Sequence, residues 1–175
     1  IKQTLAEKIA PVLSNLGFVF LKSSLKFTRK WIHFNHVINF SPNRYNQEDL
    51  IVQFHTGFGV SSKKYVRWYL DVYGEKPINN SVAGENDWNI KGWNYPKYNS
   101  QFKNQFDIAK GEDRGRVIDV LLLNILNIGI PYLENNSDWK TAAEDLLKKG
   151  SFYSKACDFY LIAGEREKAY ECLKI

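Results

Sequence analysis

Two neighbouring stretches of the chain alternate between apolar and polar positions. The even positions of residues 32–41 carry Ile, Phe, His, Ile and Phe, and those of residues 50–60 carry Leu, Val, Phe, Thr, Phe and Val. Alternation with a period of two, in segments rich in aromatic and β-branched residues, is typical of half-buried strands. The connecting residues 41–49 are rich in turn formers. We therefore predict an antiparallel hairpin with an apolar even face and a polar odd face.

The polar face of this hairpin is the first candidate binding surface. Pairing Phe40 with Leu50 keeps the two apolar faces together, and this register places Asn35 opposite His55. The patch that it assembles consists of His33, Asn35, Gln53 and His55. A metal site needs at least three well-placed ligands, and no cysteine or carboxylate lies nearby in the sequence. An ordinary polar sheet face is the interpretation that this pattern favours over a functional patch. His36, on the apolar face, is expected to be a hydrogen-bonded core histidine.

Short alternating segments at 18–22 and 25–31 extend the hairpin to a four-strand meander, which a helix over residues 3–16 should cover. Pro11 is a fault in that helix, because it removes a backbone donor. Residues 74–86 are interpreted as a polar loop. Residues 88–95 and 102–109 are weaker strand candidates that would enlarge the sheet.

Helical spacing of apolar residues recurs through the rest of the chain. Ser62 is a suitable N-cap for a helix to about residue 73, and a very apolar helix should run from Asp113 to near Pro131. Three short helices are predicted at 138–149, 151–163 and 165–173. The fold class is therefore α+β: an antiparallel sheet of four to six strands with helices on one face and a C-terminal helical hairpin. We predict a sheet domain at 1–136 and a helical appendage at 137–175 packed on it.

The formal net charge of +5 is spread unevenly, with +6 in residues 1–76 and −1 in residues 77–175. A basic half attracts nucleic acid, anionic lipid or acidic protein, and charge alone does not choose among them. Lys26 and Lys30 are predicted on the polar side of their strand, but most of the neighbouring aromatic residues fall on the core side. The two lysines therefore lack a stacking platform for single-stranded nucleic acid, and we expect weak binding at most.

Several functional classes lose support from what the sequence lacks. It contains only two cysteines, which fits a reducing compartment, and no signal peptide is evident, so we expect a cytoplasmic protein. The apolar run of residues 120–130 is interrupted by Asn124, Asn127 and Gly129, so we expect no membrane span. No glycine-rich turn ends in Gly-Lys-Ser/Thr, and we expect neither a cofactor nor a bound metal.

Short motifs resemble those of an uncharacterised bacterial domain-of-unknown-function family. They are the Leu-Gly-Phe helix end at 16–18, Phe-Thr-Arg at 27–29, Phe-Gly-Val at 58–60 and Ile-Pro at 130–131. The resemblance spans about residues 3–134 and implies a helix followed by an antiparallel sheet, with no activity to carry over. Residues 163–169 resemble the turn and second helix of a tetratricopeptide repeat. Such repeats need neighbours to bury their faces.

The tail holds many large apolar side chains for its size: Phe152, Phe159, Tyr160, Leu161, Tyr170 and Leu173. They must be covered by the preceding helix, by the main domain or by another protein. The leading hypothesis is therefore a non-catalytic bacterial protein-binding module, similar to toxin-immunity proteins, whose partner would be a toxin. A basic nucleic-acid-binding domain is the alternative. A remote third is a histidine-dependent hydrolase that uses His33, His55 and an unidentified carboxylate.

Overall fold

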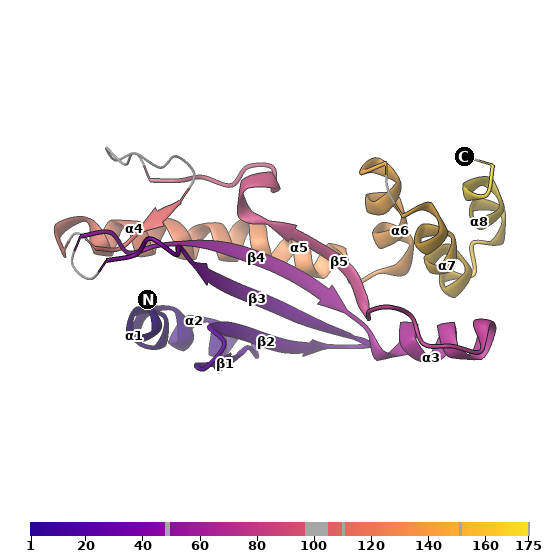
Figure 1. Cartoon of the computed structure of the whole chain (residues 1–175), viewed down its shortest axis with the longest axis horizontal. Helices are drawn as coiled ribbons and strands as arrows, with labels where there is room; N and C mark the ends of the chain where they lie inside the picture. Colours follow the sequence, from indigo (N-terminus) through magenta and orange to yellow (C-terminus); the bar gives the residue numbers. More distant parts are fainter. Residues whose placement is uncertain (48–49, 97–104, 110, 151, 175) are drawn as a thin grey trace. The chain divides into compact units, whose positions relative to one another are not determined.

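The computed structural model describes residues 1–47, 50–96, 105–109, 111–150 and 152–174 (Figure 1). It contains a six-stranded antiparallel sheet in the order β1-β2-β3-β4-β5, with β6 also paired to β4. The strands are β1 (Val19–Leu21), β2 (Lys26–Trp31), β3 (Phe34–Pro42), β4 (Gln53–Ser61), β5 (Ser81–Asn86) and β6 (Phe106–Asp107). The predicted α+β class and antiparallel sheet are confirmed.

Helices flank the sheet in the sequence and close the chain. They are α1 (Lys2–Thr4), η1 (Leu5–Ile9), α2 (Ala10–Asn15), α3 (Lys63–Tyr73), η2 (Asp87–Asn89), α4 (Gly111–Asn124), η3 (Ile125–Gly129), α5 (Ile130–Asn135), α6 (Trp139–Lys148), α7 (Tyr153–Ala163) and α8 (Arg166–Cys172). Ser62 caps α3 by accepting a hydrogen bond from the Lys64 N–H, as the sequence predicts. The three predicted C-terminal helices are also present.

The chain divides into two compact units. Unit 1 comprises Ile1–Lys30, His36–Phe58 and Glu85–Pro131, and unit 2 comprises Trp31–Asn35, Gly59–Gly84 and Tyr132–Ile175. Each unit therefore combines stretches that are far apart in the sequence. The predicted boundary between residues 136 and 137 stays a prediction.

The core of unit 1 forms on the even face of the hairpin. Phe54 lies 5.7 Å from Phe40 and 5.9 Å from Phe106, ring centroid to ring centroid. The N-terminal helices contribute buried Leu5, Ile9 and Leu13, and α4 with η3 contributes buried Val117, Leu121 and Ile125. The predicted apolar face is therefore buried within β3 and β4, whereas Ile32 (81% exposed) and Leu50 (67% exposed) lie outside these strands and Val52, just before β4, is half-buried.

Two π-helical segments each precede a proline by two residues. Leu5–Ile9 is followed by Pro11, and Ile125–Gly129 is followed by Pro131. A proline inside an α-helix lacks a donor and clashes with the carbonyl four residues back, and a wider π turn accommodates this fault. The predicted helix end near Pro131 is wrong for this reason, because the helical segments run on to Asn135.

The segments on either side of residue 87 differ from their predicted form. Residues 81–86, predicted as loop, form β5. Residues 88–95, predicted as a strand, begin in the 3₁₀ turn η2 and contain Gly92 at φ +87°. Trp93 and Tyr95 pack individually on Phe58 and Phe106, which explains the partial alternation. Of the predicted strand at 102–109, only Phe106 and Asp107 pair in the sheet, and residues 102–104 lie outside the described residues.

Within the part of the chain that the structure describes, one helical stretch, Asp113–Asn135, is long and apolar enough to cross a membrane by length and composition. This stretch is longer than the apolar run that the sequence alone suggests, because it continues through Pro131. A core helix of a soluble protein meets the same criteria. Val117, Leu121 and Ile125 of this stretch are buried in unit 1.

Unit 2 is held together by aromatic contacts and by one buried carboxylate. Tyr65 on α3 packs edge-on against Phe159 on α7, with 5.2 Å between ring centroids. Asp158 is buried and accepts hydrogen bonds from the hydroxyls of Tyr65 (3.1 Å) and Tyr73 (2.7 Å). α7 is therefore part of the core of this unit, because it anchors α3.

Candidate functional site

The pairing of β3 with β4 decides which polar residues meet. The Asn43 N–H donates to the Gln53 carbonyl oxygen (2.9 Å), and a Cβ on Gly57 would lie 2.5 Å from Oδ1 of Asn39. Asn39 and Gly57 are therefore cross-strand neighbours. Leu50 lies outside β4 and is 67% exposed, so the predicted pairing of Phe40 with Leu50 is wrong.

The cause of this different register is the side chain of Asn46. Its Oδ1 accepts from the Gln53 N–H (2.7 Å) and its Nδ2 donates to the Gln53 carbonyl (2.8 Å). An asparagine side chain thus takes the place of a strand residue, and β4 begins at Gln53 rather than at Leu50. Gln47 and Ile51 form an isolated antiparallel bridge outside the named strands.

The predicted site residues fall into both units. Gln53 and His55 lie on β4 in unit 1, whereas His33 and Asn35 belong to unit 2. The register that would have placed Asn35 opposite His55 no longer supports a shared patch of all four residues. Lys26 and Lys30 are exposed on β2 in unit 1, as predicted.

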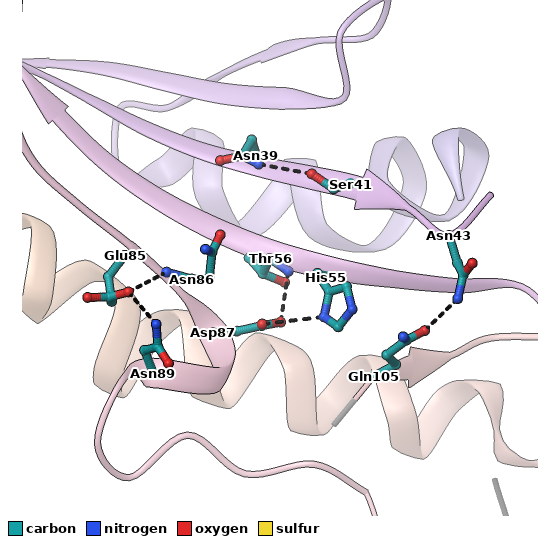
Figure 2. Close-up of polar contacts among 10 residues, drawn as sticks. All are labelled: Asn39, Ser41, Asn43, His55, Thr56, Glu85, Asn86, Asp87, Asn89 and Gln105. Carbon is teal, nitrogen blue, oxygen red and sulfur yellow. Dashed lines mark hydrogen bonds and ion pairs between the residues drawn. The ribbon is translucent and has the colours of Figure 1, made fainter. Parts of the chain in front are cut away.

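Gln53 proves to be a buried structural residue. Its side-chain Nε2 donates to Oδ2 of Asp107 (3.2 Å), and Asn43 donates to Gln105 (3.0 Å) beside it (Figure 2). These bonds fasten β6 to β4 at the register Gln53 to Asp107. Gln53 is therefore used by the fold rather than presented to a ligand.

Asp87 fills a gap along the edge of β4. That edge pairs with β5 and with β6, and Asp87 follows directly after β5. Its Oδ2 accepts a hydrogen bond from the backbone N–H of Thr56 (2.8 Å) (Figure 2). The carboxyl group thus supplies the acceptor that a neighbouring strand would otherwise provide, and Asp87 is fully buried as a result.

The second oxygen of Asp87 faces an imidazole. His55 Nδ1 lies 3.6 Å from Asp87 Oδ1, and the His55 side chain is 28% exposed. The Trp88 ring meets the His55 ring edge-on, with 4.8 Å between centroids, and is itself exposed. Because Nδ1 is buried, the exposed part of the ring lies on the side away from Asp87. His55 is therefore held between a buried carboxyl group and an exposed indole.

Burial dominates the electrostatics of this centre. It raises the pKa of Asp87, and the Thr56 N–H, the Tyr95 hydroxyl and His55 act in the opposite direction. Burial and the neighbouring Asp87 charge raise the pKa of Tyr95. The Tyr95 hydroxyl approaches the carboxyl group without closing a hydrogen bond. The buried polar atoms here that have no hydrogen-bond partner are His55 Nδ1, Thr56 Oγ1, Asp87 Oδ1 and Tyr95 Oη.

The part of the chain that matches a known family is residues 9–135. They match the family described as "Domain of unknown function (DUF4304)", and this match covers more than two thirds of the chain. The chain belongs to this family. No curated protein and no solved structure matches it. The DUF4304 region includes the whole His55–Asp87 centre and β1 to β6, whereas α6, α7 and α8 follow it.

The histidine on the apolar face fulfils its predicted role in the DUF4304 region. His36 is fully buried, and its Nδ1 contacts Arg29 Nη2 at 3.0 Å and Nε at 3.3 Å. Arg29 is also buried and stacks over the Phe18 ring. Arg29 therefore points into the core and does not contribute to the exposed basic surface.

The second candidate surface lies beyond the DUF4304 region, on α7 and α8. Phe159 and Tyr160 are buried within unit 2. The other members of the predicted apolar set are exposed: Phe152 (69%), Leu161 (39%), Tyr170 (63%) and Leu173 (71%). The sequence identified this set, and the structure separates its buried members from its exposed ones.

Metal binding has little support in the part of the chain that the structure describes. Within it, no three His, Cys, Asp or Glu side chains are grouped to hold an ion.

Asp87 and Trp88 are the site residues that sequence reasoning missed. Asp87 is far from His55 along the chain, and only the pairing of the strands brings the two together.

Proposed function

We propose that this protein is a bacterial protein-binding module that acts in the cytoplasm, similar in role to an immunity protein that neutralises a toxin by binding it. The observation that carries the proposal is the exposed apolar surface of α7 and α8. We call this the tail surface; it consists of Phe152, Leu161, Tyr170 and Leu173. Contiguous exposed apolar surface is typical of protein contact sites.

The tail surface is mounted on a rigid support. Gly164 joins the two helices in the left-handed conformation (φ +81°), and Cys157 Sγ contacts the Ala169 carbonyl at 3.4 Å. Both cysteines are buried and unbridged. A surface held by packed helices loses little conformational entropy on binding, which favours affinity.

Phe152 adds a local argument. It precedes α7 with a φ of +60°, a conformation that L side chains rarely adopt, and its ring is exposed. Glycine or asparagine would fit this backbone at a lower cost. An exposed aromatic ring kept in a strained position supports a role in contact with a partner.

Burial of the tail surface would contribute substantially to binding. Covering a large apolar side chain is worth roughly 1.5–3 kcal/mol. A few such residues supply most of the binding energy in typical protein interfaces. The tail surface therefore suffices for a specific contact, with the charged pair of Lys140 and Glu165 nearby as part of a polar rim.

The test uses the full chain and the products of the genes that adjoin its own. Calorimetry should detect a complex with one of them, and Tyr170→Ser with Leu173→Ser should weaken it by about tenfold or more. Leu50→Ser is the matched control, since Leu50 is equally exposed but lies in unit 1. The immunity-like role is wrong if no neighbouring product binds. The tail surface is the wrong site if the double variant binds as the wild type does.

A further inference from the structure

We propose that His55 and Asp87 form a nucleophilic centre in which Nε2 of His55 attacks an acyl carbon and Asp87 positions the imidazole. This proposal concerns unit 1 and is independent of the tail surface. It rests on three features of the described residues: the facing atoms of the pair, the charge on Asp87 and the open side of the imidazole ring.

The first feature is a gap between two atoms that both need a partner. His55 Nδ1 and Asp87 Oδ1 are buried, neither has a hydrogen-bond partner, and they face each other at 3.6 Å. A structural carboxylate–imidazole bond would close to about 2.7–2.9 Å. Catalytic hydrogen bonds are often long in unliganded proteins and tighten when the substrate binds. His36, a purely structural histidine, shows the contrast, because its contact with Arg29 is closed at 3.0 Å.

The second feature is a negative charge that the fold does not need. The Thr56 N–H requires only an acceptor, and the amide oxygen of an asparagine would serve at residue 87 without the cost of burying a charge. Burial raises the pKa of Asp87, so its charged form is disfavoured unless a neighbouring group stabilises it. Of the groups around Asp87, His55 is the one that can use the charge, since a carboxylate stabilises positive charge on an imidazole.

The third feature is the direction in which His55 is open. A proton on Nδ1, facing Asp87, leaves the lone pair on Nε2, away from the carboxyl group. The exposed Trp88 ring lies beside the imidazole, and Figure 2 shows Asn39 and Ser41 on the adjacent strand. These neighbours are uncharged. They suit a neutral ester with an aromatic or apolar group for the indole, and they offer no cation for a phosphate.

The reaction balances as ester hydrolysis. Nε2 forms a bond to the carbonyl carbon, and the alkoxy group leaves with the bonding electron pair. Asp87 stabilises the positive charge of the acyl-imidazole through Nδ1–H. Water then attacks the acyl carbon, the bond to Nε2 breaks, and the proton lost by the water passes to the alkoxide. The products are a carboxylic acid and an alcohol, and His55 is restored.

The three histidines allow a test within one molecule. The full chain is treated with diethyl pyrocarbonate near neutral pH, and the rate of modification of each histidine is measured by peptide mass spectrometry. His33 is exposed and serves as the reference, and buried His36 reports unfolding. We expect His55 to react about tenfold faster than His33 although it is less exposed. Equal or slower modification of His55 in the wild type overturns the proposal.

Asp87→Asn tests the positioning role. It should lower the rate at His55 to that of His33 or below and leave the rate at His36 unchanged. A faster modification of His36 would reveal that the variant unfolds. In that case the ratio of the His55 rate to the His33 rate in the wild type decides the proposal alone. Asp113→Asn, the same substitution at a part-exposed carboxyl group on α4 in unit 1, is the matched control and should leave His55 fast. An unchanged His55 rate in folded Asp87→Asn contradicts the role of Asp87.

Substrate class is tested with two chromogenic compounds that share a leaving group. The wild type should hydrolyse p-nitrophenyl acetate faster than the uncatalysed rate. His55→Gln should abolish this excess rate. p-Nitrophenyl phosphate should not be hydrolysed. Acetate hydrolysis that is absent, or that persists in His55→Gln, overturns the acyl-transfer assignment, and turnover of the phosphate overturns the ligand class.

Discussion

Arg29 and His36 lie in contact inside unit 1, with Nη2 of the guanidinium 3.0 Å from Nδ1 of the imidazole. A guanidinium can only donate, so Nδ1 accepts and the imidazole is neutral. Burial, followed by the charge of Arg29, lowers the pKa of His36 to about 4. Two basic side chains are therefore stable together in the core only while one of them stays uncharged.

This contact predicts acid sensitivity. In the unfolded chain His36 has its ordinary pKa of 6.5, and in the folded protein the pKa is about 4. Below pH 6.5 the unfolded state binds a proton that the folded state does not, so stability is present above 6.5 and is lost as the pH falls towards 4. The loss reaches about 3 kcal/mol. Urea unfolding at pH 7, 5.5 and 4.5 should show a steeper decline for wild type than for His36→Gln. Parallel declines would contradict this account.

Gly129 and Phe58 pack so closely that a side chain on residue 129 has no room. A Cβ there would overlap Cε1 of Phe58. Gly129→Ala should therefore lower the free energy of unfolding by about 1–3 kcal/mol. Gly115→Ala in α4 is the matched control, because its Cβ would meet nothing within 4 Å, and it should be neutral or stabilising. Equal changes in the free energy of unfolding for the two substitutions would show that the Phe58 ring moves to accommodate the added methyl group.

The hydrogen bond from Tyr65 to Asp158 should stabilise unit 2. Tyr65→Phe leaves the buried carboxyl group with one donor fewer, and the expected loss is about 1–3 kcal/mol in chemical denaturation. Tyr69→Phe on the same helix is the control, since the bonds to Asp158 come from Tyr65 and Tyr73. A similar loss in both variants would mean that the hydroxyl of Tyr65 is not specifically needed.

The alternative of nucleic-acid binding leads to a salt-dependence prediction. With Arg29 buried, Lys26 and Lys30 remain as exposed cations of β2. Few phosphate contacts give weak binding that falls with salt. Fluorescence anisotropy should show an affinity for single-stranded oligonucleotides that vanishes near physiological ionic strength. Tight binding there, abolished by charge reversal at Lys26 and Lys30, would place nucleic acid ahead of protein as the partner.

The sequence was informative where burial alone decides the outcome. Alternation of Phe34, Ile38, Phe40, Phe54 and Phe58 predicted the core face correctly, because a period of two fixes which side of a strand is apolar. The cap at Ser62 follows from side-chain chemistry and was also predictable. The exposed apolar residues of the tail were identified as a set.

The remaining features depend on specific tertiary contacts. The hairpin register is set by Asn46, whose side chain replaces a strand residue, and no periodicity reveals this. β5 has only Val82 and Ala83 buried, so its identity as a strand comes from pairing rather than from propensity. The contact of His55 with Asp87 could not be predicted without the correct register. The continuation of a helix through Pro131 requires the π segment before it.

The most direct test of the binding proposal is hydroxyl-radical footprinting of the full chain with and without the neighbouring gene product that binds it. The account predicts that Phe152, Tyr170 and Leu173 become protected in the complex. Tyr45 and Leu50, which are also exposed but lie in unit 1, should be oxidised equally in both samples. Protection at Trp88 and His55, with Tyr170 and Leu173 unchanged, would contradict the tail surface as the partner's binding site.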